Sequence, residues 1–280
     1  MSPMMRMNRT AGTMGMMGTM ESRRIFGSIF GSIFGSLLAS AALAAAWVPE
    51  ANATEPTHLT WAKYLVETIK PADNYYGDPG TVLWKGENGL TSSKNRTRCA
   101  PLLTQLLKKS YNTDTVGWLG CTSPHAATYH DAIEVEDGFE LIESIADVKP
   151  GDIIAIEYLD EDCYNLTCGG YSGCSTTGHV AIVLEAPTPR VETSPFVKGT
   201  EQYSVRVIDS SANPHGVYDT RYQAESNNWD DRGVGRGRMR LYVDADDPDQ
   251  PIVGYTWSTS TGSTYYPYYK RDLVIGRFKG

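Results

Sequence analysis

The sequence lacks the runs of lysine and arginine that are typical of nucleic-acid-binding proteins. It has 25 basic and 33 acidic residues, and its formal net charge is −8 at pH 7. A surface of this sign repels phosphate backbones and anionic lipids. We therefore expect no nucleic acid and no membrane among the partners of the folded part, and a neutral or cationic substrate fits better.

Cysteine is also scarce, with five residues in a chain of 280. No CxxC pair is present, so the spacing of Cys163, Cys168, Cys174 and His179 is only a weak zinc signal. The acidic turn "DADDPDQ" at 244–250 lacks the ligand spacing of an EF-hand loop. We expect no metal ion and no organic cofactor.

The N-terminal segment is typical of a secretory signal peptide. A basic pair at 23–24 precedes an uncharged apolar run at 25–48, and the small-x-small triplet "ANA" follows at 51–53. This order predicts cleavage after residue 53 and a secreted or periplasmic protein. A retained membrane anchor is the alternative, but Gly and Ser interrupt the run regularly. Eight of the nine methionines lie in the first 20 residues, so Met20 is a second candidate for the true start.

An odd number of cysteines leaves one thiol unpaired in an oxidising compartment. Three of the five lie in the polar segment 160–177, which has almost no apolar content and would need cross-links to fold. The fifth, Cys99, stands apart from them. The candidates for disulfide bonds are Cys121, Cys163, Cys168 and Cys174.

Cys99 precedes a segment with the pattern of an amphipathic helix. Pro101 is tolerated only in the first turn of a helix, so it places the helix start at or next to Cys99. Leucines at 102–107 form one apolar stripe, and Asn112 can end the helix. The free N–H groups and the dipole at a helix start lower the pKa of a thiol. Cys99 is therefore a candidate nucleophile.

A nucleophilic thiol needs a base and a group that holds this base. His179 follows a glycine and starts the apolar strand "GHVAIVLEA", where a general base is plausible. Asp209 shares the parity of Val205 and Val207 in the next strand, so it would face the helix-covered side and hold the imidazole. His215 is the competing third member. The structural alternatives are a histidine satisfied at a strand end and an aspartate that caps a turn.

Helical patterns precede strand patterns along the chain, which predicts an α+β fold. The domain boundaries that follow are a helix and loop at 54–94, a catalytic domain at 95–258 with an insertion at 160–177, and a Tyr-rich tail at 259–280. Helices are expected at 56–70, 99–112, 124–134 and 139–145. An antiparallel meander is expected from strands at 153–159, 178–186, 203–211, 237–244 and 252–258.

The order of a cysteine at a helix start, "VKPGDIIAIEY" at 148–158 and "TGHVAIVLE" at 177–185 resembles the NlpC/P60 group of papain-like cysteine peptidases and amidases. CHAP amidases share this plan. The resemblance implies helices packed on one face of a small antiparallel sheet of about five strands. It also implies that Cys99 is the nucleophile, His179 the base and Asp209 the orienting group. The chain has "TRCAPL" where the family commonly has Asp-Cys-Ser-Gly.

The resemblance further implies that a tyrosine upstream of the cysteine helps to form the oxyanion site, and Tyr75 and Tyr76 are the candidates. The function expected is an exported, monomeric cysteine hydrolase that cleaves amide bonds of peptidoglycan stem peptides or another exported peptide through a thioester. Two alternatives stay open. The same residues suit an acyltransferase or a small-amide hydrolase, and a catalytically silent binding module would retain the fold without the chemistry.

Overall fold

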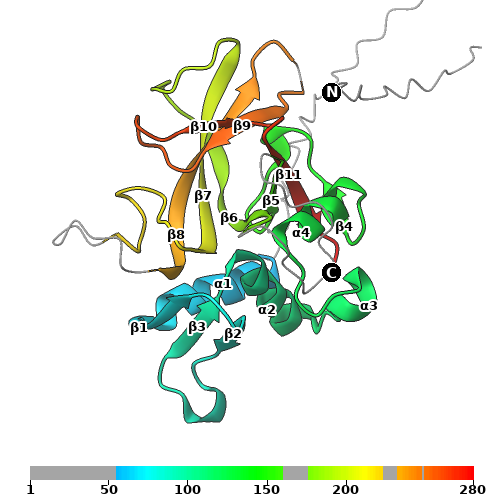
Figure 1. Ribbon diagram of the computed structural model, residues 1–280, viewed down its shortest axis with the longest axis vertical. Coiled ribbons are helices and arrows are strands. Elements are labelled where there is room, and N and C mark those ends of the chain that lie inside the picture. The colour runs from blue at the N-terminus through cyan, green and yellow to red at the C-terminus, as the bar shows by residue number, and fades with distance from the viewer. Residues whose placement is uncertain (1–54, 160–175, 223–231, 248) are drawn as a thin grey trace, which may run out of the picture. The chain divides into compact units, whose positions relative to one another are not determined.

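An eight-stranded antiparallel sheet dominates the computed structural model, which describes residues 55–159, 176–222, 232–247 and 249–280 (Figure 1). The predicted signal peptide and the cysteine-rich segment at 160–175 lie outside the described residues. The strands follow one another across the sheet in the order β10 (Tyr265–Pro267), β9 (Ile252–Thr256), β8 (Gly233–Asp244), β7 (Thr200–Ser211), β6 (Gly178–Pro189), β5 (Ile153–Tyr158), β11 (Arg271–Phe278) and β4 (Phe139–Leu141).

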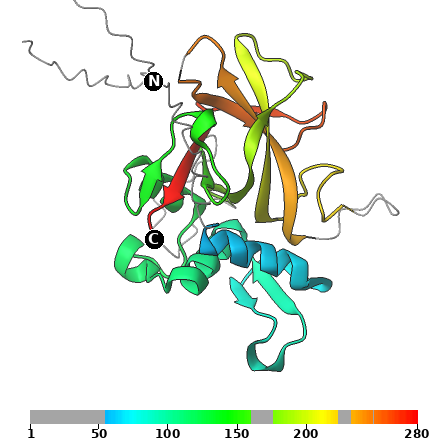
Figure 2. The same cartoon turned by 180° about the vertical axis from the view of Figure 1, so that it is seen from behind.

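A second, three-stranded sheet and the helices precede most of this sheet in sequence. The small sheet has the order β1 (Ile69–Tyr76), β3 (Ser93–Thr97) and β2 (Thr81–Leu83), with β1 and β3 parallel. The helices are α1 (Thr57–Thr68), α2 (Cys99–Tyr111), α3 (Thr115–Leu119) and α4 (Ala126–Glu134), and short 3-10 turns occupy Glu87–Gly89 and Ile145–Asp147. Figure 2 shows α1 (blue) beside the lower end of β8 (orange), with which it is in contact.

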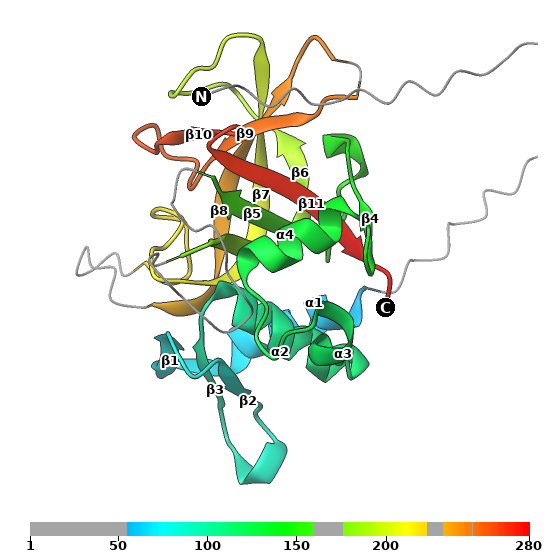
Figure 3. The same cartoon turned by 45° about the vertical axis from the view of Figure 1, so that its right-hand side comes forward.

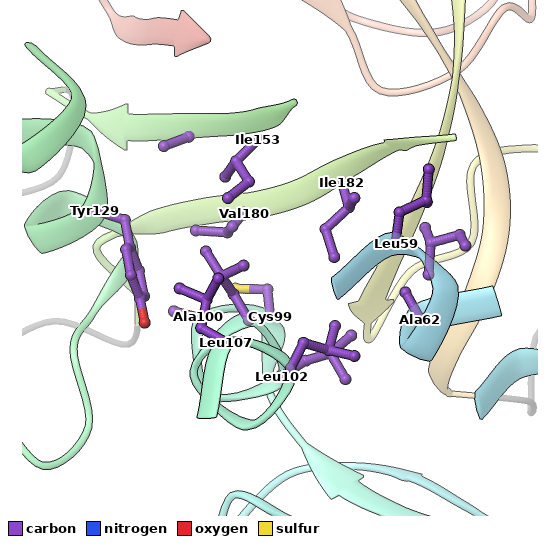
Figure 4. Close-up of a cluster of buried hydrophobic side chains, with 14 of the residues drawn as sticks. Leu59, Ala62, Cys99, Ala100, Leu102, Leu107, Tyr129, Ile153, Val180 and Ile182 are labelled. Carbon is purple, nitrogen blue, oxygen red and sulfur yellow. The ribbon is translucent and has the colours of Figure 1, made fainter. Parts of the chain in front are cut away.

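Both faces of the large sheet are buried. On one face, Ile153 of β5 and Val180 of β6 pack against α1, α2 and α4 (Figure 4). On the other face, Ile154 of β5 and Ala181 of β6 belong to a second apolar cluster with residues of β7, β8 and β11. Successive side chains of a strand point to opposite faces. The continuous apolar runs in β5 and β6 are therefore the pattern of strands buried on both sides.

The helix that starts at Cys99 forms as its sequence predicts. Arg98 is the N-cap, and Pro101 lies in the first turn, where its missing N–H costs no hydrogen bond. The leucines of α2 are buried in the first apolar cluster. Asn112 ends the helix in the left-handed conformation, with φ at 55°. Local chemistry therefore determines both ends of this element.

The predicted fold class is wrong. The described part of the chain is mostly β, with an eight-stranded and a three-stranded sheet and four α-helices, and it is not a papain-like α+β fold with a five-stranded sheet. The five predicted strands form and pair in sequence order, as β5 to β9. The segment 139–145, predicted as a helix, instead forms β4 and the start of a 3-10 turn, and the loop predicted within 54–94 contains β2 and the start of β3.

The predicted tail at 259–280 belongs to the sheet. Its strand β11 lies between β5 and β4, and Ile275 pairs with Ile154. This pairing joins segments far apart in sequence, and no local pattern encodes such a partner. Because β11 has a neighbouring strand on each side, its apolar residues Leu273 and Ile275 are buried in the sheet.

Two further observations correct or limit the expectations from sequence. Val205 and Val207 pack in the second apolar cluster and not against the helices, because a sheet buried on both faces offers either face to an apolar side chain. The inference that the parity of Asp209 aims it at the helices is therefore wrong.

Among the described residues, no helix combines the length and the apolar composition needed to cross a bilayer.

Candidate active site

Three elements meet at one end of the large sheet and bring Cys99, His179 and Asp209 together. Cys99 is the first residue of α2, His179 is the second residue of β6, and Asp209 lies near the end of β7. Because β6 and β7 are antiparallel, the start of one lies beside the end of the other. Helix α2 packs on both strands, and its N-terminus lies at the end of the sheet where β6 starts and β7 ends.

His179 connects the thiol to the carboxylate. Its Nε2 lies 2.7 Å from Oδ2 of Asp209, and its side chain also hydrogen-bonds Cys99. With Nε2 engaged by the carboxylate, Nδ1 is the ring nitrogen left for the sulfur. Figure 4 shows the Cys99 side chain at the start of α2, facing β6. The thiol, the imidazole and the carboxylate are all buried, with 8 %, 5 % and 1 % of each residue exposed.

The charges of Cys99, His179 and Asp209 favour a thiolate on Cys99 and an imidazolium on His179. Burial alone raises the pKa of Cys99, but the charge of His179, its hydrogen bond and the backbone N–H groups of Val180 and Ala100 outweigh it and lower that pKa. Burial alone lowers the pKa of His179, but Cys99 and Asp209 raise it to about 9. Both shifts favour the ion pair of a thiolate and an imidazolium, in which the thiol is in its nucleophilic form.

Asp209 is held from three sides. The same oxygen that accepts from His179 also accepts from Nε2 of His215 at 2.8 Å, and the other oxygen accepts from Arg221 at 2.8 Å. Burial raises the pKa of Asp209, but the charges of Arg221 and His215 and the hydrogen bonds from both histidines hold it well below its ordinary value. Asp209 is therefore an anion whose position is fixed.

His215 carries protons on both ring nitrogens. Its Nδ1 lies 2.7 Å from the carbonyl oxygen of Trp257, and its Nε2 faces the Asp209 carboxylate. Both partners are acceptors only, so both nitrogens must donate, which makes the ring an imidazolium. The Trp257 ring stacks on His215 with centroids 4.5 Å apart and meets His179 edge-on at the same distance. Trp257 thus covers both imidazoles.

Arg221 completes a buried charge network. It binds Asp219 through Nε and one terminal nitrogen, at 2.8 and 2.7 Å, and donates to the carbonyl oxygen of Gly233 at 2.7 Å. Asp219 also accepts from the backbone N–H of His215. The two carboxylates of Asp209 and Asp219 balance the two cations of Arg221 and His215. Buried charges are tolerated when they are paired and hydrogen-bonded in this way.

The cluster of His179, Asp209 and His215 has no space for a metal ion. Both imidazole nitrogens lie 2.7 and 2.8 Å from the same carboxylate oxygen, which are the lengths of direct hydrogen bonds. A bound ion would have to separate these atoms. The arrangement therefore suits proton transfer and orientation of His179.

A small crevice of about 30 Å³ opens beside the thiol. Its lining includes Cys99, Tyr76, Arg98 and His125. Burial raises the pKa of Tyr76, and the charge of the nearby Cys99 raises it further. The Tyr76 hydroxyl therefore keeps its proton and can donate a hydrogen bond. Tyr75, the other predicted tyrosine, is exposed and packs its ring under the Arg96 guanidinium, outside this crevice. The structure therefore separates the two candidates.

Hydrogen bonds from the small sheet fix the start of α2. Ser210, the neighbour of Asp209, donates to the carbonyl oxygen of Thr97 at 2.8 Å, two residues before Cys99. Asn95 accepts from Thr97 and donates to Asn74, which in turn binds the backbone of β8. Cys99 and Asp209 are thus held to each other through buried polar groups.

The chain is 30 % identical over 237 residues to the protein printed as "Uncharacterized protein R653" of Acanthamoeba polyphaga mimivirus. The match covers 81 % of this chain and 98 % of the viral protein. The chain belongs to the family of this viral protein. No protein-family model and no solved structure matches the present chain at a significant level. The shared span includes nearly the whole viral protein.

Another buried histidine, His58, and the buried Cys121 lie outside the crevice beside Cys99. His58 is buried in α1, with its ring nitrogens bonded to Tyr111 and to the carbonyl oxygen of Gly151, and serves the packing of α1. Cys121 is buried, and Cys99 is a free, buried thiol. Pairing of Cys121 with another cysteine stays a prediction here. Its three candidate partners, Cys163, Cys168 and Cys174, lie outside the described residues.

Sequence reasoning missed Arg221, Asp219 and Trp257, which lie in loops without a motif. One signal for them is present in β8, where "GVGRGR" places glycines at alternate positions. A Cβ on Gly235 would lie 2.5 Å from Nε of Arg221, and a Cβ on Gly237 would lie 2.4 Å from the His215 ring. Glycine in a strand interior often marks a close approach by another group. These glycines make room for the buried network.

Proposed function

We propose that this protein is a cysteine-dependent hydrolase of amide bonds, with Cys99 as nucleophile, His179 as acid and base, and Asp209 as the group that orients His179. The observation that carries the proposal is the buried, hydrogen-bonded chain from the thiol through the imidazole to the carboxylate. A purely structural cysteine needs no lowered pKa and no oriented base.

The first step is acylation. The Cys99 thiolate attacks the carbonyl carbon of the amide, the carbon–sulfur bond forms, and the carbonyl oxygen becomes an oxyanion. Backbone N–H groups at the start of α2 and the Tyr76 hydroxyl are the donors available near the sulfur. The carbon–nitrogen bond then breaks, and the amine leaves with the proton that His179 held. A thioester on Cys99 remains.

The second step is hydrolysis of the thioester. A water molecule attacks its carbonyl carbon while His179, now neutral, takes a proton from that water. The carbon–sulfur bond breaks, the acid leaves, and the thiolate and imidazolium are restored. Asp209 keeps the imidazole in the orientation that both steps need, and it stays ionised throughout because Arg221 and His215 stabilise its charge.

Peptide amides of the cell-wall type are the first substrates to test. The support for this class is the resemblance of the Cys99 and His179 segments to peptidases and amidases that act on such peptides. The acidic surface suits a neutral or cationic peptide better than a polyanion. Export and action outside the cell stay predictions, because the apolar N-terminal segment on which they rest lies outside the described residues.

The experiment compares wild type with Cys99→Ala and Cys99→Ser on purified peptidoglycan and on a library of peptide amides, with mass spectrometry of the products. We expect new amine termini with wild type and a loss of at least about 10³-fold in both variants. Iodoacetamide modification followed by peptide mapping should place the fast-reacting thiol at Cys99. Lys108→Ala, an exposed residue in the last turn of α2 and outside the crevice, is the control variant.

Two outcomes would overturn the proposal. Equal product release by wild type and Cys99→Ala would place the chemistry elsewhere. A Cys99 thiol that reacts no faster with iodoacetamide than a free cysteine at neutral pH would favour a binding module that retains the residues without the chemistry. Transfer of the acyl group to an added amine, in place of water, would show as an adduct in the same spectra and would identify an acyltransferase.

A further inference from the structure

His130 lies in the middle of α4 and faces carboxylates on both of its ring nitrogens. The residue is 2 % exposed. Its Nδ1 lies 3.7 Å from Oδ1 of Asp131 and 3.8 Å from Oε2 of Glu157. Its Nε2 lies 3.7 Å from Oδ2 of Asp272. None of these residues lines the crevice beside Cys99.

These distances are too long for hydrogen bonds. An N–H···O bond has its heavy atoms 2.7 to 3.2 Å apart. Both ring nitrogens of His130 are buried, and neither has a hydrogen-bond partner within the described residues. A buried polar group without a partner costs roughly 1–3 kcal/mol, so native proteins seldom leave both nitrogens of one ring in this state. Nδ1 of His130 therefore faces two carboxylates at distances longer than a direct hydrogen bond.

The carboxylates around His130 come from three elements. Glu157 of β5 and Asp272 of β11 pair directly across the two strands. Asp131 of α4 adds a third negative charge on the same side, since its carboxylate and that of Glu157 both approach Nδ1 of His130. Figure 3 shows α4 lying across β5 and β11, which brings the three elements to one place.

The spacing suits a single metal ion. Two ligand atoms bonded to one ion at about 2.0–2.2 Å lie roughly 3 to 3.5 Å apart. The observed separations of 3.7 and 3.8 Å exceed this by only a few tenths of an ångström. One ligand atom from each of His130, Asp131 and Glu157 falls within 4.8 Å of the other two. Small side-chain movements would bring all three into the first coordination sphere.

We propose that Nδ1 of His130 and the carboxylates of Asp131 and Glu157 bind one divalent metal ion. Asp272 then accepts from Nε2 of His130 and fixes the tautomer, as a carboxylate does behind many metal-bound histidines. One nitrogen and two carboxylate ligands favour Zn²⁺ or Mn²⁺ over Ca²⁺ and Mg²⁺, which prefer oxygen ligands alone. Asp131 is exposed, so water completes the coordination on the solvent side. The ion would tie α4 to β5 and β11.

The test is calorimetric titration of the full-length protein, stripped with a chelator, with MnCl₂ and ZnCl₂. The Cys99→Ala protein is used, because the thiol would itself bind zinc. We expect one ion per chain with a micromolar Kd, and a rise in Tm on binding. Asp131→Asn and Glu157→Gln preserve side-chain shape, and each should weaken binding at least tenfold. Glu140→Gln removes an exposed carboxylate outside this cluster and should leave the Kd unchanged.

Asp131→Asn is the variant that keeps the test interpretable, because an exposed helix residue tolerates this change without loss of the fold. Absence of saturable binding up to about 1 mM of either ion would overturn the proposal. His130 would then be an imidazolium that forms ion pairs with the surrounding carboxylates and binds no metal. Binding that Asp131→Asn and Glu157→Gln leave unchanged would overturn it equally, since the ion would then occupy another place.

Discussion

His215 donates to the same oxygen of Asp209 that orients His179, at 2.8 Å against 2.7 Å. A carboxylate oxygen has two lone pairs, so both bonds are made at once. The second histidine is held by the carbonyl oxygen of Trp257 and cannot turn away without losing that bond. The position of the carboxylate, and through it that of the imidazole beside Cys99, therefore depends on a residue that does not touch the thiol.

Replacement of His215 tests this dependence through a pH profile. His215→Gln removes a positive charge near Asp209, so the carboxylate stabilises the His179 imidazolium more strongly. We expect the alkaline limb of kcat/KM to move upward by about one pH unit, together with a fall in kcat because the carboxylate loses one of its supports. A merely structural role would lower stability and leave the limb in place. His58→Gln, far from this network, is the control.

The pH dependence of the wild type follows from the two shifted groups. The pKa of Cys99 is lowered and that of His179 is raised to about 9, so the thiolate and imidazolium coexist between these values. We expect the rate of iodoacetamide modification of Cys99 to remain high well below about pH 8.5, the ordinary thiol pKa. Activity should fall above about pH 9, where His179 loses its proton. A modification rate that follows an ordinary thiol titration would contradict this.

Gly237→Ala tests the space that β8 leaves for the network. The added Cβ would lie 2.4 Å from the His215 ring and 2.7 Å from a carboxylate oxygen of Asp219. Overpacking of this kind destabilises a protein by about 1–3 kcal/mol. We expect that loss in urea unfolding and a parallel loss of activity as His215 is displaced. Gly262→Ala is the matched control, because its Cβ would meet no atom within 4 Å. Equal stability of the two variants would refute the role of Gly237.

His58 gives a prediction about acid stability. Burial lowers the pKa of His58, against the opposing effects of its bond to Gly151 and the charge of Asp152. The unfolded chain then binds a proton more readily than the folded protein once the pH falls below about 6.5. The stability that His58 contributes is therefore present above that pH and is lost as the pH falls. In urea unfolding, the advantage of wild type over His58→Gln should shrink between pH 8 and pH 5. A constant difference would show that His58 does not titrate in this way.

Much of the candidate site follows from local chemistry. Pro101 and Asn112 determine the ends of α2, and a glycine before an apolar run marks the start of β6. Pairing of neighbouring strands in an antiparallel sheet then brings the start of β6 beside the end of β7, which was enough to associate His179 with Asp209. These relations involve residues close in sequence or strands adjacent along the chain, so the sequence carries them directly.

The parts that sequence reasoning missed depend on distant partners. Strand β11 finds its place only by pairing with β5, more than a hundred residues earlier, so its segment looked like a tail. Strand β4 is three residues long and pairs with β11, which leaves almost no local pattern. The five-stranded papain-like sheet was wrong for this reason, since three of the eight strands are defined by their neighbours.

The sequence by itself determined the helix that starts at Cys99, the order of strands β5 to β9 and the pairing of His179 with Asp209. Each of these depends on capping, proline geometry or alternation within a short segment. Tertiary structure decided the rest. The buried Arg221, the second histidine on Asp209 and the choice of Tyr76 over Tyr75 arise where loops and sheets meet, and burial there turns isolated charged residues into one balanced network.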